Sequence, residues 1–300
     1  MIIDFHAHIG DLLLTKDDGH VPITWENLIA RMDEEGIDKA AVLPVYNSSP
    51  EGAPGGIALL NDRMSVRDQV LDAARYPDRI IPFGNMDPRW LRNDPSSDFS
   101  EILDWFIEHG CKGIGEVTAN IPFDDLRTIN MFKQCGVKGL MVTIESAGLH
   151  AGPYGLQDDP GMPRFEHLLH AASETTIIAH GPGFWAEMGA WITPQQRWSY
   201  PKGPIREEGA TWHLLRTCPN LYADLSANSG YNAITRDPEA GVRFLIEFQD
   251  KLLFGTDTCS HDVRMPQQKY LTSLRDKGSI TQQVFDKIVS GNALLLLGAA

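Results

Sequence analysis

The sequence has little cysteine, and the cysteines it has do not pair. Cys111, Cys135, Cys218 and Cys259 are the four cysteines in 300 residues, and no two of them form a Cys-x-x-Cys motif. Disulfide frameworks belong mainly to short secreted chains, so widely spaced cysteines in a chain of this length favour a reducing compartment. We therefore predict a cytoplasmic protein without structural disulfides.

Long apolar runs and an excess of basic residues are also missing. No uncharged run approaches the roughly 18 apolar residues that cross a bilayer, and the first residues lack the pattern of a signal peptide. The 26 Lys and Arg residues are outnumbered by 40 Asp and Glu residues, which gives a formal charge of −14. Nucleic acid and anionic membranes would repel such a surface, so we expect neither as a partner. We expect a small-molecule substrate, and the chain could form a homo-oligomer.

The composition is otherwise that of a globular enzyme. Hydrophobic residues make up 42% of the chain and charged residues 22%, and 300 residues are enough for a large buried core. No linker, repeat or low-complexity segment interrupts the sequence. We therefore predict one domain that spans residues 1–300.

Short apolar runs rich in β-branched residues alternate with amphipathic stretches along the whole chain, a pattern typical of parallel α/β folds. The predicted strands are residues 2–6, 39–45, 80–85, 113–117, 139–145, 175–180, 221–226 and 251–256. The predicted helices are residues 25–35, 62–76, 99–109, 126–135, 164–173, 211–218, 238–248 and 281–298. Eight such units predict an α/β fold with a single (β/α)8 TIM barrel. A doubly wound open sheet is the alternative, but it would need a glycine-rich phosphate turn after the first strand.

Polar residues interrupt this pattern where the predicted strands end. They are His6, His8, Glu116, Glu145, His180 and Asp257. In a TIM barrel the carboxyl ends of all strands meet on one face, where active sites form. Burying several carboxylates there would be costly, and a divalent cation removes that cost. The pattern predicts a metal site at this end of the barrel.

Each of these residues also has a simpler interpretation. His6 and His8 stand two residues apart and could reach one metal, but such a pair could equally be two hydrogen-bonded core histidines. A lone His180 is more often structural than a ligand. Asp257 suits a ligand or general base, and could instead cap the helix after it. The simpler interpretations do not explain why all six occur at strand ends.

The motifs together resemble the amidohydrolase superfamily. They are His6-Ala7-His8 after the first strand, His180-Gly181 after the sixth, Gly255-Thr256-Asp257 after the eighth and the closing Ser290-Gly291-Asn292-Ala293. The branch that they resemble most also contains the aminocarboxymuconate-semialdehyde-decarboxylase-like enzymes, and the resemblance covers essentially the whole chain.

This resemblance implies roles for the site residues. His6, His8 and Asp257 would hold a divalent metal, with zinc expected, as one or two ions. Glu116 would occupy the position of a strand-four carboxylate that often bridges two metals. His180 would be a second-metal ligand or an acid/base group, and Asp257 would also take a proton from the attacking water.

One position departs from the family pattern. The family usually has a histidine at the end of strand five, where this chain has Glu145. Glu145 could replace the histidine as a ligand, because carboxylates and imidazoles both bind zinc, and it would favour a harder metal. Two alternatives stay open: His150 supplies the nitrogen instead, or the site has lost a metal or its activity.

The predicted function is metal-dependent hydrolysis of a C–N or C–O bond in a small lactone, amide or ester. Asp257 and His180 are the expected catalytic residues, and Trp185, Asn228 and Tyr231 are the expected substrate-binding residues. The alternatives are a metal-dependent non-oxidative decarboxylase of a small unsaturated or aromatic acid, and a non-catalytic metal-binding barrel. Residues 48–56, 148–163 and 185–208 are predicted loops over the strand ends that would decide specificity.

Overall fold

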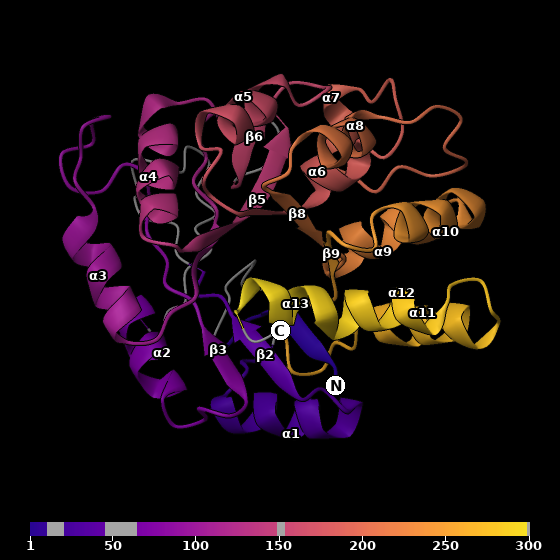
Figure 1. Cartoon of the computed structure of the whole chain (residues 1–300), viewed down its shortest axis with the longest axis horizontal. Helices are drawn as coiled ribbons and strands as arrows, with labels where there is room; N and C mark the ends of the chain where they lie inside the picture. The colour runs from indigo at the N-terminus through magenta and orange to yellow at the C-terminus, as the bar shows by residue number, and fades with distance from the viewer. Residues whose placement is uncertain (11–20, 46–64, 149–153, 299–300) are drawn as a thin grey trace.

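The computed structural model describes residues 1–10, 21–45, 65–148 and 154–298 of the chain. Strands alternate with helices, and Figure 1 shows the helices lying around the strands. Within these ranges no helix combines the length and the apolar character that crossing a bilayer requires. The strands are β1 (Ile3–Ala7), β2 (Lys39–Val42), β3 (Ile80–Pro82), β4 (Gly113–Val117), β5 (Met141–Gly148), β6 (Leu156–Asp158), β7 (Ile177–His180), β8 (Leu221–Asp224) and β9 (Leu252–Leu253).

The strands form one ring of parallel neighbours. One sheet has the order β1-β2-β3, and the second has the order β4-β5-β7-β8-β9, with β6 paired to β5. Backbone hydrogen bonds join the two sheets at both seams. Gly84 N donates to Gly113 O over 2.9 Å beside β3 and β4, and Phe5 N donates to Phe254 O over 2.8 Å between β1 and β9. Eight strands therefore follow one another around the ring, and the predicted (β/α)8 fold is confirmed.

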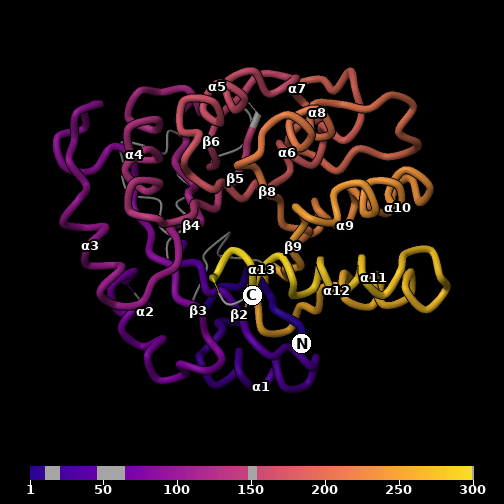
Figure 2. Tube along the Cα trace, viewed as in Figure 1, coloured from indigo at the N-terminus to yellow at the C-terminus, as the bar shows by residue number. Residues whose placement is uncertain are grey.

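Two apolar clusters stabilise this ring. The smaller cluster gathers buried side chains from six of the strands, among them Phe5 of β1, Ile81 of β3 and Ile178 of β7. Side chains from strands all around a ring can meet only in its interior. Ala293 belongs to the same cluster, and the C-terminal segment lies beside the N-terminal strand (Figure 2). The larger cluster packs the outer faces of the strands against the helices.

The helices surround the barrel as the sequence pattern predicts, with several additions. They are α1 (Trp25–Glu35), α2 (Val66–Ala73), α3 (Ser100–Glu108), α4 (Leu126–Val137), α5 (Pro163–Ala171), α6 (Pro182–Ala186), α7 (Pro194–Arg197), α8 (Ala210–Thr217), α9 (Ala227–Thr235), α10 (Pro238–Glu247), α11 (Gln267–Asp276), α12 (Gln282–Asp286), the π-helical turn η1 (Lys287–Gly291) and α13 (Asn292–Leu296). The predicted cap at Thr281 is present, since its side chain accepts a hydrogen bond from Val284 N.

Several boundaries differ from the predictions. Strand β5 continues three residues past Glu145, because residues 146–148 pair with β6, which was not predicted. Strand β9 is only two residues long, and β2 and β3 each end three residues earlier than predicted. Helices α6, α7, α9 and α11 were missed, since they lie in segments rich in Pro, Gly or polar residues where apolar periodicity is weak.

Candidate metal centre

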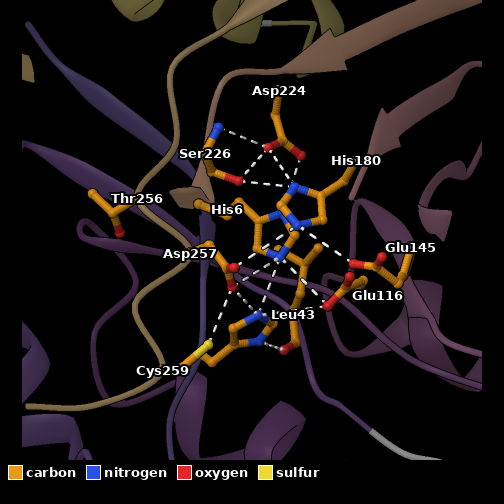
Figure 3. Close-up of polar contacts among 12 residues, drawn as sticks. His6, Leu43, Glu116, Glu145, His180, Asp224, Ser226, Thr256, Asp257 and Cys259 are labelled. Atoms are coloured by element: carbon orange, nitrogen blue, oxygen red, sulfur yellow. Dashed lines mark hydrogen bonds and ion pairs between the residues drawn. The ribbon is translucent and has the colours of Figure 1, made fainter. Parts of the chain in front are cut away.

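The six residues predicted at the strand ends lie together at one end of the barrel (Figure 3). His6 lies in β1 with His8 just after it, Glu116 in β4, Glu145 in β5, His180 at the end of β7 and Asp257 beyond β9. Glu145 and His180 are paired across neighbouring strands in the β5–β7 register. Their nitrogen and oxygen atoms form groups in which all donor atoms lie within 4.8 Å of one another.

The two histidines of the first motif are oriented by hydrogen bonds at their Nδ1 atoms. His6 Nδ1 lies 3.0 Å from Asp224 Oδ2, and His8 Nδ1 lies 2.7 Å from the Leu43 carbonyl oxygen. A carbonyl or an ionised carboxylate oxygen only accepts, so each Nδ1 atom carries the proton and each Nε2 atom presents a lone pair. The two Nε2 atoms face each other across 3.1 Å. Two lone pairs in this position require a cation or an added proton between them.

Two carboxylates complete the first half of the centre. Asp257 Oδ1 lies 3.0 Å from His8 Nε2 and 3.7 Å from His6 Nε2. Glu116 Oε2 lies 3.6 Å from His6 Nε2 and 3.7 Å from His8 Nε2. Ligands of a tetrahedral zinc ion with bonds of about 2.0 to 2.1 Å stand about 3.3 Å apart. The four residues therefore have the spacing and the chemistry of a zinc-type ligand set.

The second half of the centre is richer in carboxylate. His180 Nε2 lies 3.6 Å from Glu145 Oε2, and Glu116 lies beside both residues. Glu116 Oε1 and Glu145 Oε1 are buried and have no hydrogen-bond partner. Burial and the neighbouring charge of Glu116 raise the pKa of Glu145 well above its usual value. Unpartnered oxygens in a buried pair of carboxylates are what a bound cation would satisfy.

Asp224 is the buried residue that organises both halves, and sequence reasoning gave it no role. One oxygen accepts from His6 Nδ1, and the other lies 2.9 Å from His180 Nδ1 and also accepts from Ser226 Oγ. Burial alone would raise its pKa, but the charges and hydrogen bonds of His180 and His6 lower the pKa far below the usual range. Its signal in the sequence was an acid in the otherwise apolar run 221–226, the same signal that singled out Glu116.

The backbone around Asp257 is fixed by a second buried acid that was also not predicted. Asp4 accepts hydrogen bonds from Thr256 N over 2.9 Å and from Thr256 Oγ1 over 2.6 Å. Asp257 N donates to His6 O over 2.7 Å. Asp257 has a φ of 56°, in the left-handed region that non-glycine residues seldom occupy. Strain of this kind is common at functional sites, where surrounding contacts hold the residue in place.

The three predicted substrate-binding residues lie in three different surroundings. Trp185 is 2% exposed, and its indole Nε1 donates to Asp224 O over 3.1 Å, so it belongs to the core beneath the site. Asn228 is exposed on α9. Tyr231 packs its ring against Tyr270 of α11, with centroids 5.8 Å apart. Substrate binding by these residues stays a prediction, and the burial of Trp185 favours a structural role.

The family that the sequence matches agrees with a metal site of this kind. The family model described as amidohydrolase matches residues 3–299. The chain belongs to the amidohydrolase family. This agrees with the resemblance of the strand-end motifs, and the family is one of enzymes. No curated protein sequence matches the chain.

Solved structures share the fold of this amidohydrolase. One is an amidohydrolase from Burkholderia multivorans with bound zinc, at 12% identity and a TM-score of 0.65, covering 99% of both chains. A second is a probable 2-pyrone-4,6-dicarboxylic acid hydrolase from Acinetobacter baumannii, at 14% identity and a TM-score of 0.57, covering 99% of both chains. A third is a dihydroxybenzoic acid decarboxylase from Polaromonas with bound manganese, at 15% identity and a TM-score of 0.59, covering 99% of this chain and 96% of that one.

These relatives include both hydrolases and decarboxylases, so the fold alone leaves the reaction open. The residue in place of the expected strand-five histidine is Glu145, whose carboxylate lies within the cluster. The alternative nitrogen ligand, His150, lies outside the described residues.

Proposed function

We propose that this amidohydrolase hydrolyses a C–N or C–O bond in a small lactone, amide or ester, with a divalent metal held by the cluster. His6, His8, Glu116 and Asp257 would hold one ion, and Glu116, Glu145 and His180 offer donors for a second. A bound divalent cation would polarise the substrate carbonyl and make water more acidic. Zinc fits the nitrogen-rich half, whose ligand spacing is that of a tetrahedral site.

The observation that carries this proposal is the position of Asp257. Its side chain is 18% exposed, whereas the side chains of the other five cluster residues are at most 6% exposed. Asp257 is therefore the member that water and substrate can reach. Burial opposes its charged form, but the contacts with His8 and the charges of His6 and His180 outweigh burial and lower its pKa. Asp257 therefore favours its ionised form, which is the form that a proton acceptor requires.

The other residues would orient the reacting groups. Asp257 takes the proton from the attacking water and then delivers it to the leaving oxygen or nitrogen. His180 Nε2 lies 3.8 Å from Asp257 Oδ2, on the side of the cluster away from His8. With no second ion bound, and with a proton on Nε2, His180 would stabilise negative charge that develops on the substrate oxygen. Asp224 keeps His6 and His180 in the required orientation and touches no substrate.

The charges in the described part of the site support the proposed hydrolysis. Besides a metal, a decarboxylase would gain from a cationic side chain that binds the carboxylate it removes. Among the described residues, no Lys or Arg side chain is hydrogen-bonded or ion-paired with the six cluster residues. A neutral carbonyl compound needs no such group.

The first test is metal analysis of protein purified without added metal, followed by assays with neutral esters, lactones and amides. Bound transition metal and hydrolysis of at least one class are expected. Release of CO2 from an aromatic acid, with no hydrolysis, would instead favour decarboxylation. A metal-loaded protein that is inactive in all these assays would favour the non-catalytic barrel.

Asp257→Asn tests the assigned base. An amide cannot take the proton, so we expect a loss in kcat of about 10²- to 10⁴-fold, with metal still bound to the histidines. The measurement is kcat together with metal content per chain. Asp262→Asn, an exposed acid in the same segment, is the control and should retain wild-type activity. Full activity of Asp257→Asn would refute the assignment.

A further inference from the structure

A short line of contacts leads from Asp257 to an aromatic wall. Cys259 Sγ donates to Asp257 Oδ1 over 3.2 Å, so Cys259 borders the metal cluster directly. Cys259 and Tyr154 both pack against Val45 in a small apolar cluster apart from the main core. The Tyr154 ring is therefore linked to the proposed base through Val45 and Cys259. Burial and the charges of Glu145, Glu116 and Asp257 raise the pKa of Tyr154, in agreement with this position.

A second segment adds one aromatic side chain to this wall. The Trp198 ring meets the Tyr154 ring edge to face, with centroids 5.2 Å apart and an interplanar angle of 82°. The two rings, Val45 and Cys259 therefore form one line of contacts that ends at the most exposed ligand of the centre.

This second segment is held in place by a buried arginine. Arg197, the last residue of α7, is fully buried and donates to Glu187 Oε1 over 2.7 Å and to Asp159 O over 2.8 Å. Thr193 and Gln196 form a capping box at the other end of the same short helix. The position of Trp198 is therefore set by contacts on the α7 side, independently of any ligand.

The charge next to the wall is negative. Glu116, Glu145, Asp224 and Asp257 bring four carboxylates to the centre, and with one divalent cation, in the zinc-type half of the centre, two of these charges stay unbalanced. An anionic substrate would meet this excess without a Lys or Arg partner among the described residues. A flat neutral ring would instead gain aromatic contacts of about 0.5 to 1.5 kcal/mol.

We propose that Tyr154 and Trp198 form a ring-binding wall that selects substrates with an uncharged aromatic or conjugated ring beside the scissile carbonyl. This deepens the proposed hydrolase function and rests on it. Tyr154 and Trp198 supply the faces and edges that contact the ring. Arg197 is a positioning residue that acts through Trp198.

Two sets of compounds, one for binding and one for hydrolysis, separate the two effects. Binding of acetophenone and 4-acetylbenzoate, which cannot be hydrolysed, is measured by saturation-transfer NMR on the metal-loaded full chain. Hydrolysis is measured with phenyl acetate, 4-acetoxybenzoate and the ring-free ethyl acetate. We expect acetophenone to bind more tightly than its carboxylate counterpart, and phenyl acetate to have the highest kcat/KM.

Variants assign the effect to the wall. Tyr154→Ala and Trp198→Ala should each weaken acetophenone binding and raise the KM for phenyl acetate by roughly two- to tenfold, with kcat nearly unchanged. Tyr154→Phe keeps the ring and should keep wild-type affinity. Trp191→Ala is the matched control, because Trp191 belongs to the same segment but is 86% exposed and bonds to Glu207. It should change neither quantity.

The results that would overturn the wall differ from those that would overturn the hydrolase assignment. A preference for the carboxylate-bearing probes would overturn the wall and leave hydrolysis standing. Equal losses in Trp198→Ala and Trp191→Ala would also overturn it. Acetophenone binding that depends on Trp198, with no ester hydrolysed, would support the wall and overturn the hydrolase assignment.

Discussion

At the scale of single residues, the main feature of this site is the way hydrogen bonds orient three histidine rings. His6 and His180 each place Nδ1 against an oxygen of Asp224, and His8 places Nδ1 against the Leu43 carbonyl. All three Nε2 atoms are thereby left as lone pairs that point into one space. Partners of this kind fix the tautomer of a ligand histidine and increase its basicity. The carboxylates Glu116, Glu145 and Asp257 face the same space, so they could share a cation with these nitrogens.

Asp224→Asn should break this control. The amide oxygen of an asparagine can accept a hydrogen bond from one histidine, but its NH2 group faces the other, which forces that ring into the opposite tautomer. We expect metal affinity or activity to fall about 10- to 100-fold, measured by competition with a chromophoric chelator and by kcat/KM. Asp276→Asn, at an exposed position far from any ligand in sequence, is the control. Unchanged metal affinity in Asp224→Asn would refute the role of Asp224.

At the scale of elements, the turn between β7 and α6 sets the space available to Glu145. Gly181 follows His180 and has φ 93° and ψ 164°, a conformation open essentially only to glycine. A Cβ atom at this position would lie 2.2 Å from Glu145 Oε1 and 2.8 Å from Ser146 N. The glycine that follows β7 therefore leaves the space that Glu145 of the neighbouring strand β5 occupies.

Gly181→Ala should displace Glu145 as well as strain the backbone. The strain costs about 1 to 3 kcal/mol of folding stability, and the displaced carboxylate should lower metal content or activity further. Gly203→Ala is the matched control, because Gly203 also has a positive φ, of 84°, but a Cβ there meets nothing within 4 Å. Denaturant unfolding and metal content per chain are measured for both. Equal effects of the two variants would show that the position of Glu145 is unimportant.

At the scale of the whole molecule, a bound cation would stabilise the closed barrel. Candidate ligands from β1, β4, β5, β7 and the segment after β9 meet at one point, so a metal held there would join strands from all around the ring. Without it, burial and charge repulsion raise the pKa of Glu145, and protons must replace the cation. The folded chain would bind the metal and the unfolded chain would not, so binding would add to stability.

Removing the metal should therefore lower the melting temperature. At 100 to 1,000 times the dissociation constant, the metal contributes about 3 to 4 kcal/mol, which corresponds to roughly 6 °C in a chain of this size. The measurement is calorimetry of metal-loaded and chelator-treated protein. A His6→Ala/His8→Ala double variant should show no such difference. The same Tm for both forms of the wild type would contradict a metal that bridges the strands.

Much of the fold could be predicted, because the strands of a parallel barrel are buried on both faces and appear as short apolar runs. The eight barrel strands follow these runs, with shifts at the ends of β5 and β9. Helices such as α9 and α11 were missed where apolar periodicity was weak. Strand β6 was missed because its pairing depends on where β5 ends in space, which no local pattern records.

The sequence by itself determined the type of fold and the six polar residues at its strand ends, because a charge in an apolar strand has no local explanation. Only the tertiary structure decided how those residues are used. It placed Asp224 between His6 and His180, paired Glu145 with His180, and moved Trp185 into the core. The physical reason is that hydrogen-bond partners and burial depend on contacts between residues up to 218 positions apart. Spacing along one strand can predict which residues meet, but not which atoms they present.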